Sequence, residues 1–217
     1  MYRGQSAASG YPEIVEVGAG CTGVLIGPIT VLTAEHCVRN KKIVDLYSFQ
    51  WKPDGTLDRI RATVVGRDTN RDLAIACLAR DPHVSPAIVA GRPTKGMVFE
   101  AVGFGAWASG GAAVPIEIVR SAATGTPLPL PKKGLSRIVQ EPEAETFIAQ
   151  ITSDAISVAC VGDSGGPAYA PPGTKRVMGI AREHSERDSC GQPVRYTRLD
   201  LPVVQAWLKM TVGQCKL

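Results

Sequence analysis

Short apolar or alternating runs follow one another along most of the chain, and turn-forming residues separate them. Turn signals include Pro53-Asp54-Gly55, Ser109-Gly110-Gly111 and Pro171-Pro172-Gly173. Many short strands joined by turns are typical of a sandwich or a barrel, so the pattern predicts an all-β fold. The predicted strands are Ile14–Val17, Gly23–Ile26, Val31–Thr33, Ile43–Phe49, Ile60–Val65, Leu73–Leu78, Met97–Val102, Ile116–Ser121, Thr146–Ile151, Pro167–Tyr169, Val177–Ala181 and Val194–Leu199.

Two segments depart from this pattern. The sequence DLPVVQAWLKMTV begins with Asp200 as an N-cap and predicts a C-terminal helix. Its apolar face would comprise Val203, Val204, Trp207 and Leu208. Residues 124–145 are rich in proline and charge and predict a long surface loop, because strand-like runs resume on both sides.

Composition and charge exclude two classes of partner. Of 217 residues, 44% are hydrophobic and 20% charged, as in an ordinary globular protein of one large or two small domains. The longest apolar run, Val24–Leu32, is broken by Gly27 and Pro28 and is shorter than the roughly 18 residues that cross a bilayer. The net charge is only +4, and the basic residues are spread among acids. We therefore expect neither a membrane nor a nucleic-acid partner.

The cysteines indicate the cellular compartment. Six are present, and none is spaced as Cys-x-x-Cys, so disulfides are a better interpretation than zinc. Disulfides persist in oxidising compartments, which predicts a secreted or periplasmic protein. Residues 1–10 lack the apolar core of a signal peptide, so we interpret the sequence as a processed or recombinant form.

The stretch Cys160–Pro167, CVGDSGGP, carries the strongest chemical signal. Nucleophilic serine catalysis needs a hydroxyl on a tight turn, so that backbone N–H groups can aim at the developing oxyanion, and glycines permit that close approach. The residues that fit are Gly162, Ser164, Gly165 and Gly166. A glycine-rich hairpin without a role would explain SGG alone, but not all eight residues.

Three motifs resemble those of the chymotrypsin-like serine proteases in order and approximate spacing: TAEHC at Thr33–Cys37, RDLAI at Arg71–Ile75, and CVGDSGGP. The resemblance continues through VGFG at Val102–Gly105 and GIAREHSERDSCGQPVRYTRL, and covers nearly the whole chain. It implies two six-stranded antiparallel β-barrels, a C-terminal α-helix and an active site between the barrels. The barrels would comprise residues 1–96 and 97–217.

The resemblance also assigns roles to residues at the motif positions. His36 would be the general base and then acid, Asp72 the carboxylate that orients the imidazole, and Ser164 the nucleophile. The N–H groups of Gly162 and Ser164 would form the oxyanion hole. Asp68 is a rival for Asp72, but the apolar strand that the motif requires follows Asp72.

The same resemblance implies two disulfides, one beside the histidine and one beside the specificity pocket, and leaves two cysteines to pair by elimination. The expected bridges are Cys21–Cys37, Cys160–Cys190 and Cys77–Cys215. Two disulfides that are common in animal relatives are missing, which together with the short chain resembles a bacterial member.

Two positions depart from the family's pattern. Glu35 stands where the family has a small residue, and Arg182 stands where it has a serine that hydrogen-bonds the catalytic aspartate. We hypothesise an ion pair between Glu35 and Arg182 beneath the triad, because guanidinium and carboxylate match in shape and a lone buried charge is costly. The alternative is that both side chains turn outward to water.

The substrate pocket is interpreted from three positions. Val158, six residues before the nucleophile, would form the pocket floor and offers no acid to a Lys or Arg side chain. His184 and Val194 would be the walls and narrow the pocket, which favours cleavage after small or medium apolar residues, or a blocked pocket. Alternatively, a protonated His184 would receive an acidic side chain.

Met1 stands where the family has the new N-terminus released from a zymogen. In the family this α-ammonium pairs with the aspartate before the nucleophile, here Asp163. Arg3 replaces a glycine of that motif. The alternative is that Met1 is a cloning residue without a pairing role.

The sequence thus predicts a secreted serine endopeptidase that acts on polypeptides through an acyl-enzyme, without a metal or an organic cofactor. A protein inhibitor is a second expected partner, and the chain is expected to be a monomer. The alternative is a pseudoprotease used as a binding module, with catalysis impaired by Glu35, Arg182 and a filled pocket. Retention of His36, Asp72 and Ser164 favours the enzyme.

Overall fold

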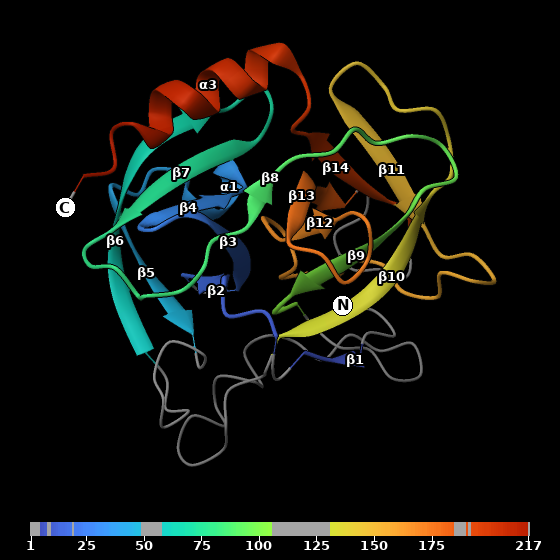
Figure 1. Ribbon diagram of the computed structural model, residues 1–217, viewed down its shortest axis with the longest axis horizontal. Coiled ribbons are helices and arrows are strands. Elements are labelled where there is room, and N and C mark those ends of the chain that lie inside the picture. Colours follow the sequence, from blue (N-terminus) through green and yellow to red (C-terminus); the bar gives the residue numbers. More distant parts are fainter. Residues whose placement is uncertain are drawn as a thin grey trace.

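The computed structural model describes residues 5–7, 10–18, 20–48, 58–105, 131–184, 190 and 192–216, without the side chains of residues 6, 183 and 184. Two sets of strands lie side by side, and one helix crosses the outside of the first set (Figure 1). The strand predicted at Ile116–Ser121 and the turn signals at 53–55 and 109–111 lie outside the described residues.

The first barrel closes through six strands in the order β2-β3-β4-β7-β6-β5. All of these pairings are antiparallel. The strands are β2 (Ile14–Val17), β3 (Cys21–Gly27), β4 (Thr30–Thr33), β5 (Ile43–Ser48), β6 (Asp58–Asp68) and β7 (Leu73–Leu78).

The second barrel follows the order β10-β11-β14-β13-β12-β9, and antiparallel pairing of β9 with β10 closes it. Its strands are β9 (Val98–Gly103), β10 (Lys132–Ile138), β11 (Thr146–Gln150), β12 (Pro167–Tyr169), β13 (Arg176–His184) and β14 (Val194–Arg198). Two short strands extend this sheet: β1 (Gln5–Ser6) pairs with β10, and β8 (Ile88–Val89) runs parallel to β13. The prediction of two six-stranded antiparallel barrels is confirmed.

Three apolar cores stabilise this arrangement: one inside each barrel and one between the barrels. In β4, Val31 lies in the core of the first barrel and Leu32 in the core between the barrels. In β7, Ala74 lies in the core of the first barrel and Ile75 in the core between the barrels. Successive side chains of a strand point to opposite faces, so a strand covered on both faces reads as a continuous apolar run. This explains the uninterrupted apolar stretches in the sequence.

The predicted surface loop at residues 124–145 is wrong for residues 132–138, which form β10 in the second barrel. The strand looks polar in the sequence because its buried face includes Ser136, whose hydroxyl donates to the Ser157 carbonyl at 2.7 Å. Leu135, on the opposite face, stays 38% exposed. A buried serine that donates to a backbone carbonyl therefore makes this barrel strand look like a polar loop in the sequence.

The predicted C-terminal helix is confirmed as α3 (Pro202–Val212), but its start and buried face differ from the prediction. Proline is favoured in the first turn of a helix, and the expected cap, Asp200, instead pairs with Arg198 at 2.7 Å. Val203 is 51% exposed. The buried residues of α3 are Val204, Leu208 and Thr211. Neither α3 nor the short α1 (Glu35–Val38), the helices in the described part of the chain, is long and apolar enough to cross a bilayer.

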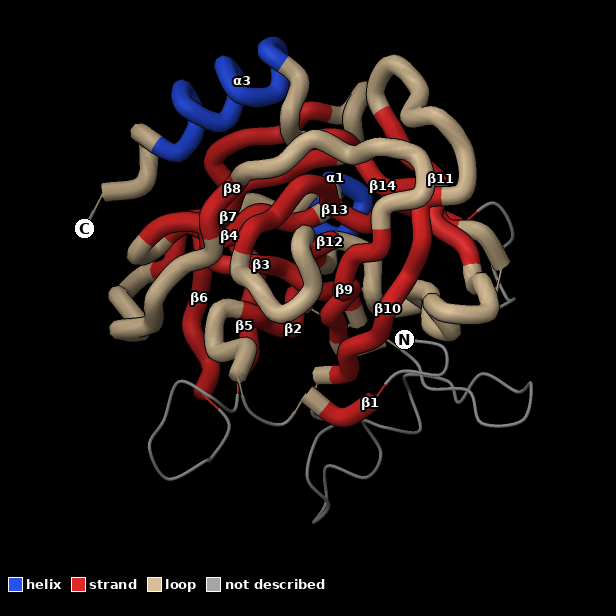
Figure 2. The backbone as a smooth tube through the Cα atoms, turned by 45° about the vertical axis from the view of Figure 1, so that its right-hand side comes forward, coloured by secondary structure: helices blue, strands red, loops and turns tan. Residues whose placement is uncertain are grey.

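The described elements nearest to the two ends of the chain each contact the opposite barrel. Strand β1 extends the sheet of the second barrel, whereas α3 packs against the first, where a Cβ at Gly66 would lie only 2.2 Å from Thr211 Cγ2. Figure 2 shows α3 on the side of β6 and β7 and β1 beside β10. A division between residues 96 and 97 stays a prediction.

The structure contains three disulfides, with the expected partners: Cys21–Cys37, Cys77–Cys215 and Cys160–Cys190. The second joins β7 to the segment after α3, across a sequence separation of 138 residues. It therefore fastens the end of the chain to the first barrel.

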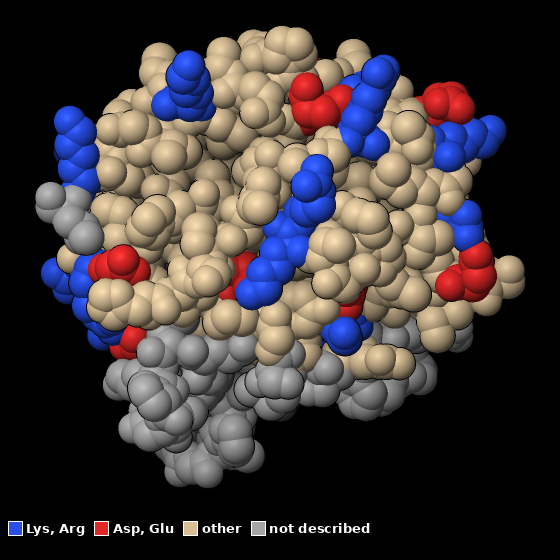
Figure 3. Space-filling view, in the orientation of Figure 1, with Lys and Arg blue, Asp and Glu red and all other residues tan. Residues whose placement is uncertain are grey.

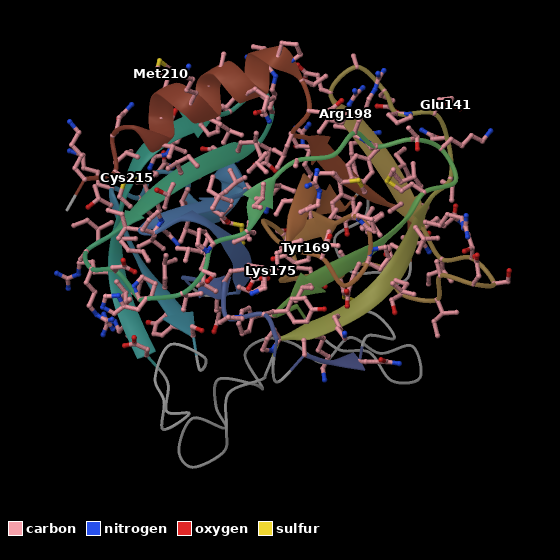
Figure 4. The ribbon with its side chains drawn as sticks, in the orientation of Figure 1. Glu141, Tyr169, Lys175, Arg198, Met210 and Cys215 are labelled. Atoms are coloured by element: carbon pink, nitrogen blue, oxygen red, sulfur yellow. A yellow bond between two sulfur atoms is a disulfide. The ribbon has the colours of Figure 1, made fainter. Side chains whose placement is uncertain are left out.

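A fully buried acid, Glu13, joins the two barrels just before β2. Tyr169 Oη of β12 donates to Glu13 Oε1 at 2.8 Å, and Lys175 Nζ pairs with Glu13 Oε2 at 2.7 Å. Burial, followed by the charge of Glu13, raises the pKa of the Tyr169 hydroxyl well above its ordinary value. The tyrosine thus stays a donor at neutral pH, and Figure 4 shows it close to Lys175 near the centre of the molecule.

A second buried acid, Glu100 of β9, lies at the same junction. Tyr11 Oη donates to Glu100 Oε1 at 2.8 Å, and Lys133 Nζ pairs with the same oxygen at 3.1 Å. The rings of Tyr11 and Tyr169 stack with their centroids 6.1 Å apart. Each buried carboxylate therefore has a tyrosine and a lysine partner, which offsets the cost of burying its charge.

Candidate active site

His36 and Asp72 meet in the first barrel. His36 lies in the single turn of α1, and both views place α1 among the strands (Figures 1 and 2). Asp72 lies just before β7 with a φ of 55°, a left-handed conformation that aspartate tolerates better than most residues. Its Oδ2 lies 2.8 Å from His36 Nδ1, and its Oδ1 accepts the His36 backbone N–H at 2.9 Å. The carboxylate therefore fixes the ring by two contacts.

This contact determines which ring nitrogen is available for proton transfer. Asp72 can only accept at Nδ1, so the neutral imidazole carries its proton there and leaves the Nε2 lone pair free. Burial alone would raise the pKa of the Asp72 carboxyl, but the hydrogen bonds from His36, with the charges of His36 and Arg182, outweigh it. The pKa of Asp72 is therefore lowered, and the carboxylate stays ionised.

The rival carboxylate, Asp68, is already engaged by Arg71. Its Oδ1 accepts the Arg71 backbone N–H at 3.1 Å, and its Oδ2 pairs with Arg71 Nη1 at 2.9 Å. Arg71 Nη2 also pairs with Glu145 of the second barrel at 3.0 Å. Asp68 thus orients Arg71, which bridges the barrels through its ion pair with Glu145. Asp72 is the carboxylate that contacts His36.

The backbone of residues 160–166 forms a loop whose N–H groups divide into two sets. Four donate to protein acceptors: those of Cys160, Asp163, Gly165 and Gly166. Within the described residues, those of Val161, Gly162 and Ser164 have no acceptor. Gly162 is buried and has a φ of 92°, which favours glycine. The two N–H groups predicted for the oxyanion hole are therefore available to a ligand.

Asp163 shapes this loop from inside the protein. Its carboxylate is buried and accepts the N–H groups of Cys160 at 2.7 Å and Gly105 at 2.9 Å. A Cβ at Gly103 or Gly105 would lie 2.3 or 2.5 Å from Asp163 atoms, which explains both glycines of VGFG. Neither glycine is predicted from the sequence to have a role, although their spacing is a signal of close backbone approach. The predicted partner Met1 lies outside the described residues, and the pairing stays a prediction.

Ser164 and His36 both contact the sulfur of Cys37, but no hydrogen bond joins their side chains in the described part of the structure. His36 Nε2 lies 3.6 Å from Cys37 Sγ, and the same sulfur lies 3.7 Å from the Ser164 carbonyl oxygen. This sulfur belongs to a disulfide and has no proton to donate, so both are van der Waals contacts. Catalytic hydrogen bonds are often long or poorly aligned before substrate binds.

The expected ion pair between Glu35 and Arg182 is wrong. Buried Glu35 instead pairs with Arg39, four residues later, whose Nε and Nη2 both lie 3.1 Å from Glu35 Oε2. Arg182 Nη2 donates to the Asn70 carbonyl at 3.4 Å. The helical turn of α1 brings residues i and i+4 together, which satisfies Glu35 locally.

Two of the predicted pocket residues lie in the core of the second barrel. Val158 and Val194 are fully buried there. The backbone of His184 pairs with Val194 across β13 and β14, and its side chain is outside the described residues. Both positions are apolar, and their place in a substrate pocket stays a prediction.

One group of metal-binding residue types occurs among the described residues: Cys21, His36 and Cys37, whose ligand atoms lie within 4.8 Å of one another. The two sulfurs form a disulfide and present no thiolate. The group therefore does not fit a metal ion while this bridge is intact.

Comparisons with known proteins identify the family. The family model described as Trypsin matches residues 4–208, whereas a search of curated protein sequences finds no significant match. The structure is similar to that of neuropsin, a serine protease expressed in the limbic system of mouse brain (TM-score 0.72, 21% identity, 98% of this chain and 100% of that chain). It is also similar to HL collagenase (TM-score 0.72, 17% identity, 98% and 99%) and to a mutant of human heparin binding protein (TM-score 0.72, 18% identity, 100% and 98%). At these identities the structures show the fold, and the family match spans all three motifs. The protein therefore belongs to the trypsin family of serine proteases.

Proposed function

We propose that this protease cleaves polypeptides through an acyl-enzyme on Ser164, with His36 as base and acid and Asp72 as its orienting carboxylate. The observation that carries the proposal is the double contact of Asp72 with His36, beside the loop that presents Ser164. Because the contact with Asp72 keeps the His36 proton on Nδ1, Nε2 is the ring nitrogen that can accept the Ser164 proton.

The expected reaction has two halves. Ser164 Oγ attacks the substrate carbonyl carbon while its proton passes to His36 Nε2, and the oxyanion accepts hydrogen bonds from the N–H groups of Gly162 and Ser164. The imidazolium, stabilised by Asp72, then protonates the leaving amine. Water repeats the sequence on the acyl group and frees Ser164. The available N–H groups and the lowered pKa of Asp72 support both halves.

The preferred substrates are polypeptides with a small or medium apolar residue before the scissile bond. Buried Val158, as the floor, and Val194, as a wall, support this preference, because apolar side chains cannot compensate a buried Lys or Arg charge. A peptide library with each residue type at that position tests the preference. Fastest cleavage after Lys or Arg would contradict it, and fastest cleavage after Asp or Glu would favour the alternative role of His184.

We expect the protein to act outside the cytoplasm, as a monomer, with a protein inhibitor as a further partner. Three disulfides support an oxidising compartment. The face drawn in Figure 3 has a short diagonal band of Lys and Arg near its centre, and other charged side chains stand apart, several beside an acid. Charges of both signs occur on this face, and we expect no nucleic-acid partner.

A fluorophosphonate probe tests the catalytic proposal, because only an activated serine takes the label. The wild-type chain should be labelled at one site and should hydrolyse peptides. Ser164→Ala should abolish both, and His36→Ala should reduce both to background. Labelling that persists in Ser164→Ala would place the nucleophile elsewhere.

The second candidate function is a binding module that keeps the protease fold. The lack of a hydrogen bond between Ser164 and His36 among the described residues favours it. A folded wild-type chain that takes no label and hydrolyses no library peptide would select this alternative.

A further inference from the structure

Thr22 of β3 contacts the loop that carries Ser164, and no motif in the sequence predicts a role for it. We propose that Thr22 is a positioning residue for the oxyanion hole, an inference that rests on the proposed function of Ser164. Its side chain is fully buried and belongs to the first barrel, whereas the loop belongs to the second. The catalytic loop is therefore fixed by a residue of the opposite barrel.

Thr22 binds the carbonyl groups of both oxyanion-hole residues. Its hydroxyl donates to the Gly162 carbonyl at 2.8 Å, and its backbone N–H donates to the Ser164 carbonyl at 2.8 Å. The hydroxyl also accepts the Phe104 N–H at 3.0 Å. The Thr22 carbonyl in turn accepts the Thr33 hydroxyl at 2.7 Å.

These contacts immobilise two peptide groups of the loop. The peptide between residues 162 and 163 is held at its carbonyl by Thr22 and at its N–H by the Cys160 carbonyl. The peptide between residues 164 and 165 is held at its carbonyl by Thr22 and at its N–H by the Ala181 carbonyl. Each held peptide begins at a residue whose own N–H has no acceptor among the described residues.

The hydroxyl matters most at Gly162, because a glycine resists rotation of its flanking peptides less than any other residue. With the following peptide fixed at both ends, Gly162 keeps its φ of 92° and its N–H keeps one direction. Without the hydroxyl, the Gly162 carbonyl loses its partner and that peptide is held at its N–H alone. An oxyanion hole stabilises charge only if its donors are aimed before the reaction.

The surroundings of Thr22 allow little movement. A Cβ at Gly103 would lie 3.0 Å from its Oγ1, and a Cβ at Gly166 would lie 3.3 Å from its Cγ2. The β-branched side chain is also stiff about χ1. Since the Phe104 N–H occupies an acceptor site of the hydroxyl, its one proton is directed to Gly162.

The experiment compares two pairs of side chains that differ in the hydroxyl: threonine with Thr22→Val, and Thr22→Ser with Thr22→Ala. The fluorophosphonate titrates the active sites of each preparation, so turnover is expressed per reactive Ser164. We expect kcat per site to fall about tenfold in Thr22→Val, with KM changed less than about twofold, because the lost hydroxyl acts on transition-state contacts. Thr22→Ser should retain most of the rate and Thr22→Ala should not.

Two further measurements separate positioning from a general loss of structure. A peptide aldehyde, whose hemiacetal oxygen occupies the oxyanion hole, should bind Thr22→Val about tenfold more weakly than wild type, in parallel with kcat. Thr211→Val is the matched control, because the buried Thr211 hydroxyl also donates to one backbone carbonyl, that of Trp207 at 2.8 Å, within α3. It should be destabilised without a change in kcat per site.

The outcomes are distinguishable. Equal kcat per titrated site in Thr22→Val and wild type overturns this inference alone, and so does a rise in KM at constant kcat. If Thr22→Val does not fold, the same comparison of kcat per titrated site is made between Thr22→Ser and Thr22→Ala, and equal values overturn this inference. A wild-type chain that takes no label overturns the proposed function and this inference with it.

Discussion

Replacing Lys175 should destabilise the protein more than replacing Glu13, although the two side chains form one ion pair at the junction of the barrels. Glu13 is fully buried, whereas the side chain of Lys175 is 36% exposed. Lys175→Met leaves a buried carboxylate with the Tyr169 hydroxyl as its remaining partner among the described contacts. Glu13→Gln keeps an oxygen for Tyr169 and lets the Lys175 ammonium turn to water.

The magnitudes follow from this difference in burial. Removing one partner of a buried pair costs about 3–5 kcal/mol, and partial exposure of Lys175 favours the lower value, about 3 kcal/mol, for Lys175→Met. Glu13→Gln loses a charge-assisted contact but leaves no buried charge, which costs about 1 kcal/mol. For a domain of this size, 1 kcal/mol corresponds to about 2–4 °C, so we expect the Tm to fall by about 6–12 °C and about 2–4 °C respectively.

Thermal unfolding and urea unfolding at neutral pH measure both variants. The double variant should be about as stable as Glu13→Gln alone, because the neutral amide that replaces the carboxylate no longer needs the lysine. Exposed Lys95, replaced by Met, is the control and should change stability by less than about 0.5 kcal/mol. Equal losses in the two single variants, or a smaller loss in Lys175→Met, would refute the reasoning.

Three further predictions concern the catalytic centre and the disulfide that joins β7 to the segment after α3. Because hydrogen bonds from His36 keep the pKa of Asp72 below its ordinary value, protonation of this carboxyl should add no loss of kcat/KM in the pH range where an ordinary aspartate takes up its proton; an acid-side loss in that range that Asp72→Asn lacks would show that the carboxyl titrates there. Asp72→Asn should lower kcat/KM for a peptide substrate by about 10³–10⁴, and Asp68→Asn by less than about tenfold, so equal losses would mean that the orienting carboxylate is misassigned. Replacing Cys77 and Cys215 together by Ser should lower the free energy of unfolding in urea by about 3–5 kcal/mol without altering kcat; unchanged stability would show that this bridge constrains the unfolded chain little.

Much of the fold could be predicted because two kinds of signal are local. Strands such as β4 and β7, covered on both faces, appear as continuous apolar runs, and the motifs around His36, Asp72 and Ser164 are contiguous in the sequence. Strand β10 could not be recognised, because its buried face includes Ser136, whose partner Ser157 lies 21 residues away.

The partners of charged groups were harder to predict than the groups themselves. The sequence marks Glu35 as unusual, but its partner Arg39 follows from helical spacing in α1, a turn of only four residues that the sequence pattern does not predict. Glu13 and Tyr169 are 156 residues apart, and nothing local marks Glu13 as buried. Thr22 was missed for the same reason, since its hydroxyl meets Gly162 only when the two barrels pack together.

The bridge between Cys77 and Cys215 turns the intervening stretch into a closed covalent ring that leaves β7 and returns to it. A proteolytic enzyme can itself be cut by neighbouring copies, and a single cut anywhere inside that ring severs the backbone without releasing a fragment. The two pieces stay one molecule, with every strand of the second barrel still tethered to the first. Shedding a piece then requires reducing agent, so nicked copies should separate into two bands on a denaturing gel only after thiol treatment.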